Sequence, residues 1–255
     1  MRNPHVDWLV YRLEWPSTTT FQNPPPVECD TAAFHVVLHD GQVRFDFKEH
    51  HTTVESAHSS VAPFLRAWEI SAGLTYGANK VHFVYENAGL TERDQRLGDP
   101  TEISAHLSAK FGLSASATVV RASYPEPPKA FVVSPTVETL WTRYEGYLSG
   151  REPLSSMAYF RLTVIENSVG RQSGKRKAAA ARYSIHVEVL KKLGEITASR
   201  GSPATARKMD DSLAPQTPAE VGWIEATVKA IIIRVAEIEA GAAVQPIEMS
   251  RLPSL

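Results

Sequence analysis

The 255-residue sequence contains a single cysteine, Cys29. One cysteine excludes a disulfide within the chain and a zinc site made of several cysteines. No apolar run approaches the roughly 20 residues of a membrane-spanning helix, and the first residues lack the charged and then apolar pattern of a signal peptide. We therefore expect a cytoplasmic protein that has no membrane partner.

Several signatures of catalysis and nucleotide binding are also missing. The chain has no Gly-x-x-x-x-Gly-Lys-Ser/Thr phosphate loop, no Gly-x-Gly-x-x-Gly, no Gly-x-Ser-x-Gly and no helical His-Glu-x-x-His. A cysteine nucleophile would have to be Cys29, which follows a proline-rich stretch and has no marked partner. We therefore expect no cofactor, and the sequence leaves open whether the chain is an enzyme.

Histidine is more plentiful, and five of the nine histidines fall between residues 35 and 58. His35 and His39 lie four residues apart, which places both on one face of a strand. A metal site that combines neutral imidazoles with Asp46 or Glu49 is one interpretation. The alternative, which we favour because the carboxylates are scattered, is a hydrated sheet face with no metal.

Charge is nearly balanced over the whole chain, with a formal net charge of −1, but the two halves differ. Residues 1–130 hold 11 basic and 15 acidic side chains, whereas residues 131–255 hold 16 basic and 13 acidic ones. Within residues 171–211 the counts are 10 basic and 4 acidic. A chain of this length can form two domains, and the C-terminal half carries a local basic region.

Residues 1–123 show the alternation and the turn signals of a sheet domain. Asp40-Gly41 between two apolar runs is a strong hairpin signal, because both central residues of the favoured turn need positive φ. This order predicts a mostly antiparallel sheet with helices packed on one face. We predict strands at 6–15, 34–38, 43–48, 80–86 and 117–122, helices at 62–72 and 101–110, and an exposed loop at 16–30.

The second half reads as helical. Prolines at 125, 127 and 128 indicate a linker over residues 124–134. Ser134-Pro135 and Thr217-Pro218-Ala219-Glu220 have the form of helix starts, the latter as a capping box. The chain is therefore predicted to be α+β, with a sheet domain at 1–123, an all-α helical bundle at 135–240 and a flexible tail at 241–255.

Residues 175–196 are the stretch that points most directly to a partner. A basic cluster and four alanines lead to a corner at residues 183–186, and apolar residues then return at helical spacing. This predicts a helix-turn-helix-like segment in which Ser184 replaces the usual corner glycine. The residues predicted to bind nucleic acid or another acidic partner are Lys175, Arg176, Lys177, Arg182, Lys191 and Lys192. Two packed helices with a hydrated basic face are the alternative.

The buried-looking helix at residues 157–166, Met-Ala-Tyr-Phe-Arg-Leu-Thr-Val-Ile-Glu, resembles the HEPN-like helical domains. The resemblance covers residues 135–240. Such domains often follow an unrelated N-terminal module in bacterial proteins, many of them linked to defence or toxin systems. Their RNA-cleaving members carry an arginine and a histidine separated by four to six residues. The resemblance implies Arg182 and His186 as the catalytic pair, although only three residues separate them here.

The leading functional prediction is a non-enzymatic binding or assembly module whose basic helical face contacts an acidic partner. The helical bundle would contact a protein or a second copy, and residues 221–238 supply an apolar seam that packs either within the chain or between copies. The alternative is an RNA-directed protein. It would bind RNA or DNA through the helix-turn-helix-like segment, or cleave RNA with Arg182 and His186.

Overall fold

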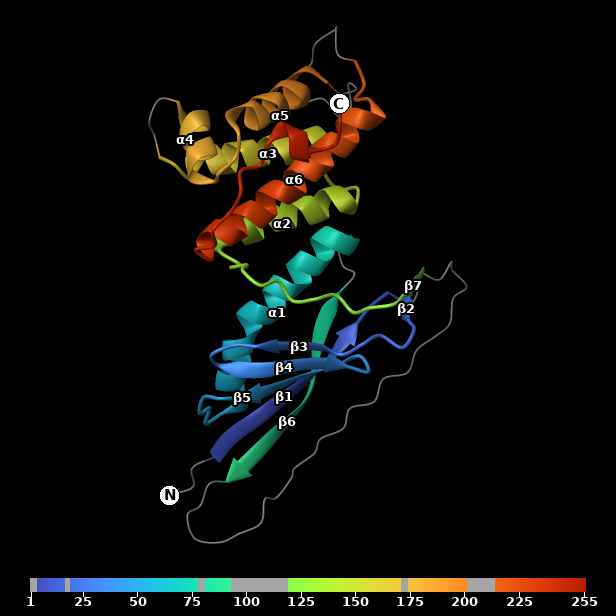
Figure 1. Ribbon diagram of the computed structural model, residues 1–255, viewed down its shortest axis with the longest axis vertical. Helices are drawn as coiled ribbons and strands as arrows, with labels where there is room; N and C mark the ends of the chain where they lie inside the picture. The colour runs from blue at the N-terminus through green and yellow to red at the C-terminus, as the bar shows by residue number, and fades with distance from the viewer. Residues whose placement is uncertain (1–3, 17–18, 78–80, 93–118, 171–173, 201–213) are drawn as a thin grey trace. The chain divides into compact units, whose positions relative to one another are not determined.

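The computed structural model divides the chain into two compact units, Met1–Pro128 and Lys129–Leu255 (Figure 1). The structure describes residues 4–16, 19–77, 81–92, 119–170, 174–200 and 214–255. An antiparallel sheet in the first unit and helices in the second confirm the predicted α+β class. The helix predicted at 101–110 lies outside the described residues.

Unit 1 is built on a five-stranded antiparallel sheet with the strand order β3-β4-β5-β1-β6. A separate two-stranded sheet pairs β2 with β7 in parallel. Asp40 and Gly41 join β4 to β5 with φ values of 50° and 74°, which confirms the predicted hairpin. The strands are β1 (Pro4–Glu14), β2 (Thr19–Phe21), β3 (Val27–Asp30), β4 (Phe34–His39), β5 (Gln42–Phe47), β6 (His82–Glu92) and β7 (Val119–Arg121).

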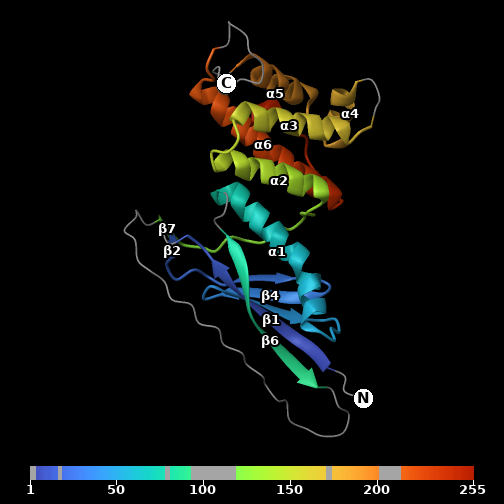
Figure 2. The same ribbon diagram turned by 180° about the vertical axis from the view of Figure 1, so that it is seen from behind.

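A long helix, α1 (Val54–Tyr76), lies across one face of the five-stranded sheet (Figures 1 and 2). Alternate strand residues such as Leu9, Val36 and Phe45 are buried in the core that this helix covers. Phe64 of α1 meets the ring of Phe45 edge-on at 5.9 Å. The polar residues that alternate with these along the strands lie on the opposite face of the sheet.

Unit 1 differs from the prediction in its element boundaries. The predicted loop at 16–30 contains two short strands, because β3 pairs with β4 and β2 pairs with β7. The helix starts at Val54 rather than 62, since Thr53 Oγ1 accepts the Ser56 backbone N–H at 3.1 Å. Pro63 consequently lies inside the helix and not in its first turn.

Unit 2 consists of helices, and two of them, α2 and α6, start at the predicted caps. Ser134 Oγ accepts the Val137 N–H at 3.1 Å. The capping box is present too: Glu220 N donates to Thr217 Oγ1 at 3.1 Å, and Thr217 N donates to Glu220 Oε2 at 2.8 Å. The helices are α2 (Pro135–Leu148), α3 (Leu154–Asn167), α4 (Lys175–Arg182), α5 (Val187–Ser199), α6 (Pro218–Glu239) and the 3-10 turn η1 (Met249–Arg251).

Helix α3 contacts α2, α4, α5 and α6, and of its residues only Asn167 is exposed. It carries a fully buried arginine, Arg161. The guanidinium donates to the carbonyl of Met157 at 2.9 Å and to that of Leu140 in α2 at 2.6 Å. Burial lowers the pKa of Arg161 to about 9, opposed by the nearby Glu152 carboxylate. A buried cation therefore joins α3 to α2.

The apolar seam of α6 packs inside unit 2. Ile224, Val228, Ile231 and Val235 are all fully buried within the chain. These four side chains therefore pack within the chain, whereas Val221 and Ile238 at the two ends of the seam are half-buried. Among the described residues, no helix combines the length and the apolar character needed to cross a membrane.

The predicted linker and tail both make specific contacts. Tyr124 belongs to the core of unit 1, and its hydroxyl accepts the Gly41 N–H at 2.9 Å. Val132 N donates to the Ala236 carbonyl at 3.2 Å within unit 2. In the segment expected to form a flexible tail, Ile247 is buried and exchanges backbone hydrogen bonds with residues around Ile185. The composition of the linker and of the tail indicates loops, but one buried side chain anchors each segment, Tyr124 in the linker and Ile247 in the tail.

Candidate functional site

The predicted helix, corner and helix are present as α4, residues 183–186 and α5. Ser184 adopts a left-handed φ of 48°, the conformation that a glycine usually supplies at such a corner. Its carbonyl accepts hydrogen bonds from Arg234 Nη1 at 2.7 Å and from Ile247 N at 3.0 Å. Arg234 is itself buried, so α6 and the C-terminal segment together hold the corner in this shape.

The two cations predicted on α5 lie beside acidic residues of the same helix. Lys191 Nζ is 2.8 Å from the Glu188 carboxylate, and Lys192 Nζ is 3.1 Å from the Glu195 carboxylate. Glu188 and Glu195 are both well exposed. The outer face of α5 is therefore close to neutral, which weakens its attraction for phosphate.

Helix α4 differs because it carries only basic charges. Lys175, Arg176 and Lys177 occupy its first turn, which contains no acidic residue and no side-chain cap. The backbone N–H groups at a helix start carry a partial positive charge. Cations placed there are repelled by that charge and lower the stability of the helix. Arg176 pairs with Glu166 at 2.7 Å, whereas Lys175 donates to the neutral amide of Asn167 at 3.0 Å. Lys177 is exposed.

Arg182 and His186, the two residues implied by the HEPN resemblance, make separate contacts in the structure. Arg182 Nη1 donates to the Ser168 carbonyl at 3.0 Å, and its guanidinium lies 5.4 Å from the centre of the Tyr183 ring. His186 is exposed at the start of α5 and lines a shallow hollow with Ala180 and Ile185. Within the part of the chain that the structure describes, no interaction joins the two side chains.

The N-terminal histidines are spread over both faces of unit 1. His35 and His39 lie on the polar sheet face, each 3.5 Å from an aspartate, Asp30 and Asp40 respectively. His5 stacks on the His50 ring at a centroid distance of 4.8 Å. A search of the described residues finds no group of three or more histidine, cysteine, aspartate or glutamate side chains arranged to hold a metal ion.

A groove of 460 Å³ on unit 1 brings together polar groups that the sequence leaves far apart. Tyr11 of β1 and His58 of α1 both line it, and the Tyr11 hydroxyl lies 2.5 Å from His58 Nδ1. Tyr85 of β6 packs edge-on against the His58 ring at 4.3 Å. The groove is lined by Tyr11, His58, Ser59, Ala62, Leu65, Arg66 and Glu69. Its volume lies within the range of small-molecule sites, about 300–1,000 Å³.

Tyr11 and His58 form a hydrogen bond between two neutral groups. Burial, reinforced by the neighbouring Tyr85, raises the pKa of Tyr11 well above its usual range, so the phenol keeps its proton. Burial lowers the pKa of His58, with Glu55 opposing the shift, so the imidazole is neutral at pH 7. The tautomer of the imidazole decides which of the two groups donates.

Sequence reasoning missed this groove because the predicted helix started too late. With a start at residue 62, His58 belongs to the loop after the hairpin and has no defined direction. The available signal was Thr53, a good N-cap residue immediately before Val54 and Glu55. The pairing of His58 with Tyr11, 47 residues away, had no local signal.

Two other lining residues of the groove, Arg66 and Glu69, form an ion pair. Arg66 Nη1 lies 3.1 Å from Glu69 Oε2, and Glu69 Oε1 accepts the Phe83 N–H at 3.3 Å. His82 Nδ1 of β6 is 3.7 Å from the same carboxylate. The negative charge of Glu69 is therefore balanced by groups from α1 and β6.

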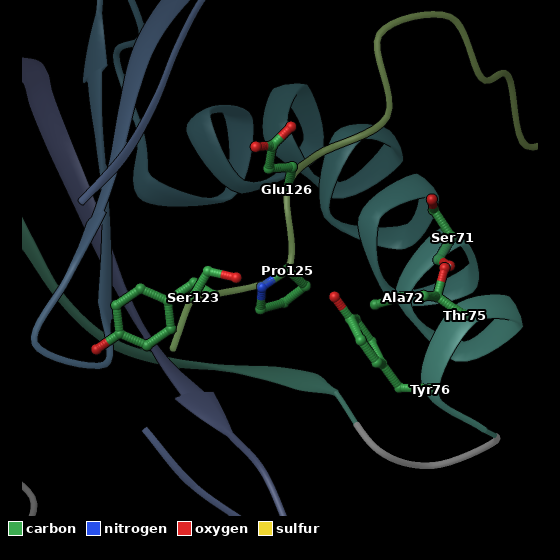
Figure 3. Close-up of a pocket in the computed structure, with 8 residues that line it drawn as sticks. Ser71, Ala72, Thr75, Tyr76, Ser123, Pro125 and Glu126 are labelled. Atoms are coloured by element: carbon green, nitrogen blue, oxygen red, sulfur yellow. The ribbon is translucent and has the colours of Figure 1, made fainter. Parts of the chain in front are cut away.

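A second hollow, of 310 Å³, lies between the last turns of α1 and residues 123–126 (Figure 3). The Tyr76 hydroxyl points toward Pro125 across it. The Arg121 guanidinium lies 4.2 Å from the centre of the Tyr76 ring. The hollow presents hydroxyl groups and one carboxylate, and its lining includes no histidine or cysteine. Its members are Ser71, Ala72, Thr75, Tyr76, Ser123, Tyr124, Pro125 and Glu126.

Comparisons with protein-family models, with curated proteins and with solved structures found no match to this chain. The HEPN-like resemblance of residues 135–240 therefore stays a prediction.

Proposed function

We propose that this chain is a binding module whose helix α4 contacts an acidic segment of a protein partner. The observation that carries the proposal is the first turn of α4, which holds Lys175, Arg176 and Lys177 and no acidic or capping side chain of its own, with only Arg176 paired to a carboxylate, that of Glu166 in α3. Such a cluster opposes the helix dipole and lowers stability. An anionic partner would reverse that cost, because it would be attracted both by Lys175 and Lys177 and by the N–H groups at the helix start.

The charge around α4 supports a compact acidic partner rather than a long nucleic acid. Helix α4 spans only eight residues, which is about 12 Å at 1.5 Å per residue. Next to it, α5 presents Glu188 and Glu195, whose carboxylates would face a phosphate backbone that extended beyond α4. An acidic peptide segment can place two or three carboxylates on α4 and avoid these glutamates.

The test compares charge removal on the two helices. Fluorescence anisotropy with a labelled poly-glutamate peptide would measure affinity for the wild type, for Lys175→Gln with Lys177→Gln, and for Lys191→Gln with Lys192→Gln. Both double variants lose two positive charges, so net charge is matched. The first pair removes charge from α4 and keeps the Arg176 and Glu166 ion pair. We expect the α4 variant to weaken binding about tenfold at low salt and the α5 variant to change it less than twofold.

Equal weakening by both double variants would contradict a role for α4 in particular and would indicate a diffuse charge effect. The same titrations with labelled single-stranded RNA and duplex DNA address the alternative function. If nucleic acid binds more tightly than the peptide and retains its affinity at physiological salt, the acidic-protein proposal fails. An RNA-cleavage assay with His186→Ala would then decide whether Arg182 and His186 act as the HEPN-like resemblance implies.

A further inference from the structure

The hollow at the corner between α4 and α5 lies beside the face of α4 that carries Lys177. We propose that the acidic segment bound by α4 places one aliphatic side chain, such as that of a leucine, in this hollow. The inference rests on the proposed function of α4 and specifies its partner, which supplies carboxylates to the cations and an aliphatic residue beside them. All the residues involved belong to unit 2.

The hollow has a volume of 340 Å³ and a mostly aliphatic lining. Ser184 and His186 are its polar members, and its lining includes no carboxylate, lysine or arginine. A surface of this kind binds an apolar group by removing it from water. The side chain that suits the hollow is therefore aliphatic rather than acidic. The aliphatic lining residues are Ala180, Ala181, Ile185, Val187 and Pro246.

Backbone hydrogen bonds join the three segments that form the hollow. Ile185 N donates to the Ala180 carbonyl at 2.9 Å, which connects the corner to α4. His186 N donates to the Ile247 carbonyl at 2.9 Å, and Ile247 N donates to the Ser184 carbonyl at 3.0 Å. These bonds hold the C-terminal segment against the corner. The hollow is therefore formed before a partner binds, and binding carries only a small cost for ordering it.

Lys177 and the hollow lie on one face of α4. Ala181 follows Lys177 by four residues, and residues at this spacing are neighbours on a helix surface, about 6 Å apart along the axis. Both residues are exposed. Arg176 pairs with Glu166, whereas within the part of the chain that the structure describes no carboxylate pairs with Lys177. Lys177 is therefore a cation that a partner carboxylate can reach beside the hollow.

The distance between Lys177 and Ala181 suits a carboxylate and an aliphatic side chain on one short segment. In an extended peptide, alternate residues project to the same side about 7 Å apart, which is close to the distance between Lys177 and Ala181 along α4. The two contacts can thus come from residues i and i+2 of the partner. A segment in which an aliphatic residue stands among glutamates or aspartates meets this requirement.

The experiment measures the fluorescence anisotropy of two labelled peptides with the full chain, at low and at physiological salt. One peptide has a leucine between two runs of three glutamates, and the other has serine in place of the leucine, so length and charge are equal. We expect the leucine peptide to bind the wild type about fivefold more tightly, because a shallow hollow removes part of the side chain from water. This leucine advantage should persist at physiological salt, since salt screens charges and not apolar burial.

Two matched variants locate the leucine contact. Ala181→Gln places a longer polar side chain at the hollow without changing charge, at an exposed position that glutamine suits as a good helix former. We expect it to remove the leucine advantage and to change the affinity of the serine peptide less than twofold. Ala219→Gln makes the same change at an exposed position of α6, about 22 Å along the helix from Arg234, which contacts the corner. This control should keep the leucine advantage.

Failure of this inference and failure of the proposed function give different results. Lys175→Gln with Lys177→Gln should weaken both peptides about tenfold at low salt if α4 binds acidic segments. Equal affinity of the two peptides for the wild type, with both weakened by that double variant, would overturn the hollow as a binding site and leave the function of α4 standing. A leucine advantage retained in Ala181→Gln would place the leucine elsewhere and would also overturn the inference. Should neither peptide bind, or should the double variant leave both affinities unchanged, the proposed function fails and this inference fails with it.

Discussion

At the residue scale, the absence of a side chain at Gly89 leaves room for the Trp8 indole on the polar face of the sheet. A Cβ atom at Gly89 would lie 2.2 Å from Nε1 of Trp8, so the indole lies directly against the glycine backbone. The Arg44 guanidinium lies 4.7 Å from the centre of the same indole. Gly89 therefore provides the space that the Trp8 side chain occupies.

We expect Gly89→Ala to destabilise the protein by about 1–3 kcal/mol, because the indole must move out of its present position. The double variant Gly89→Ala with Trp8→Leu should recover most of that loss, since the smaller side chain leaves room for the new methyl group. Urea unfolding of the four proteins in this cycle measures the coupling. Additive effects would show that the cost of Gly89→Ala arises elsewhere.

His58 gives the protein a defined pH dependence of stability. Its folded pKa is lowered by burial, against Glu55, while the unfolded pKa is about 6.5. As pH falls through about 6.5, the unfolded chain gains this proton first, so the stability that neutral His58 provides is complete above that pH and is lost below it. The groups that face His58 are Tyr11 from β1, Tyr85 from β6 and Glu55 from its own helix.

We therefore expect the wild type to lose more stability between pH 7.5 and pH 5.5 than His58→Phe does. Urea unfolding at both pH values measures the two losses, and comparison within the pair cancels the contributions of the other titrating groups. An identical pH dependence in both proteins would mean that His58 titrates alike in the folded and unfolded states.

At the element scale, the backbone is strained at Ser184, in the corner between α4 and α5. Ser184 has positive φ, which costs a residue with a Cβ roughly 1 kcal/mol or more, and its carbonyl is held by Arg234 and by Ile247. Ser184→Gly should stabilise unit 2 by up to about 1 kcal/mol, because glycine adopts this φ without a steric penalty. Ser184→Val should destabilise it by more than about 1 kcal/mol, since a β-branched residue is an outlier there.

Thermal unfolding followed by circular dichroism distinguishes these variants of the corner. Ser184→Ala serves as the control, because it keeps the Cβ and removes only the hydroxyl. If the glycine variant proves less stable than the alanine variant, the backbone entropy of glycine outweighs the relief of strain, and the corner is not strained enough to matter.

At the scale of the whole molecule, each unit contains a core of its own. Unit 1 buries residues of α1 against the five-stranded sheet, with Trp68 fully buried. Unit 2 buries Trp141 and Trp223 among helices α2 to α6. Both units therefore possess the apolar interior that an independent domain needs.

We expect residues 129–255, produced alone, to fold into a helical unit with a cooperative thermal transition. Near-ultraviolet circular dichroism would report ordered tryptophans, and Trp141→Ala in the same fragment should lower its stability by about 3–5 kcal/mol through cavity formation. A fragment with helical signal but no near-ultraviolet signal would show that unit 2 needs unit 1 for its packing.

Local chemistry explains most of what could be predicted. Asp40-Gly41, Ser134-Pro135 and Thr217 to Glu220 mark a turn and two helix starts that depend on residues close in sequence, and all three are present. The α+β class and the antiparallel sheet likewise follow from periodicity. The helix-turn-helix-like segment was predictable because its alanines and apolar spacing are local.

Long-range contacts decided the rest. The strand β3 and the docking of Ile247 depend on partners that no local pattern indicates, such as β4 for the strand. The start of α1 at Thr53 and the near-neutral face of α5 are local by contrast, since the two lysines of α5 pair with glutamates three residues away on the same helix. Tyr11 and His58 come within 2.5 Å only because α1 lies over β1. Sequence by itself determined most of the helices and strands and their caps, whereas tertiary packing decided the short strands β2 and β3 and the polar contacts between elements, because these depend on distances between parts of the chain that are far apart in sequence.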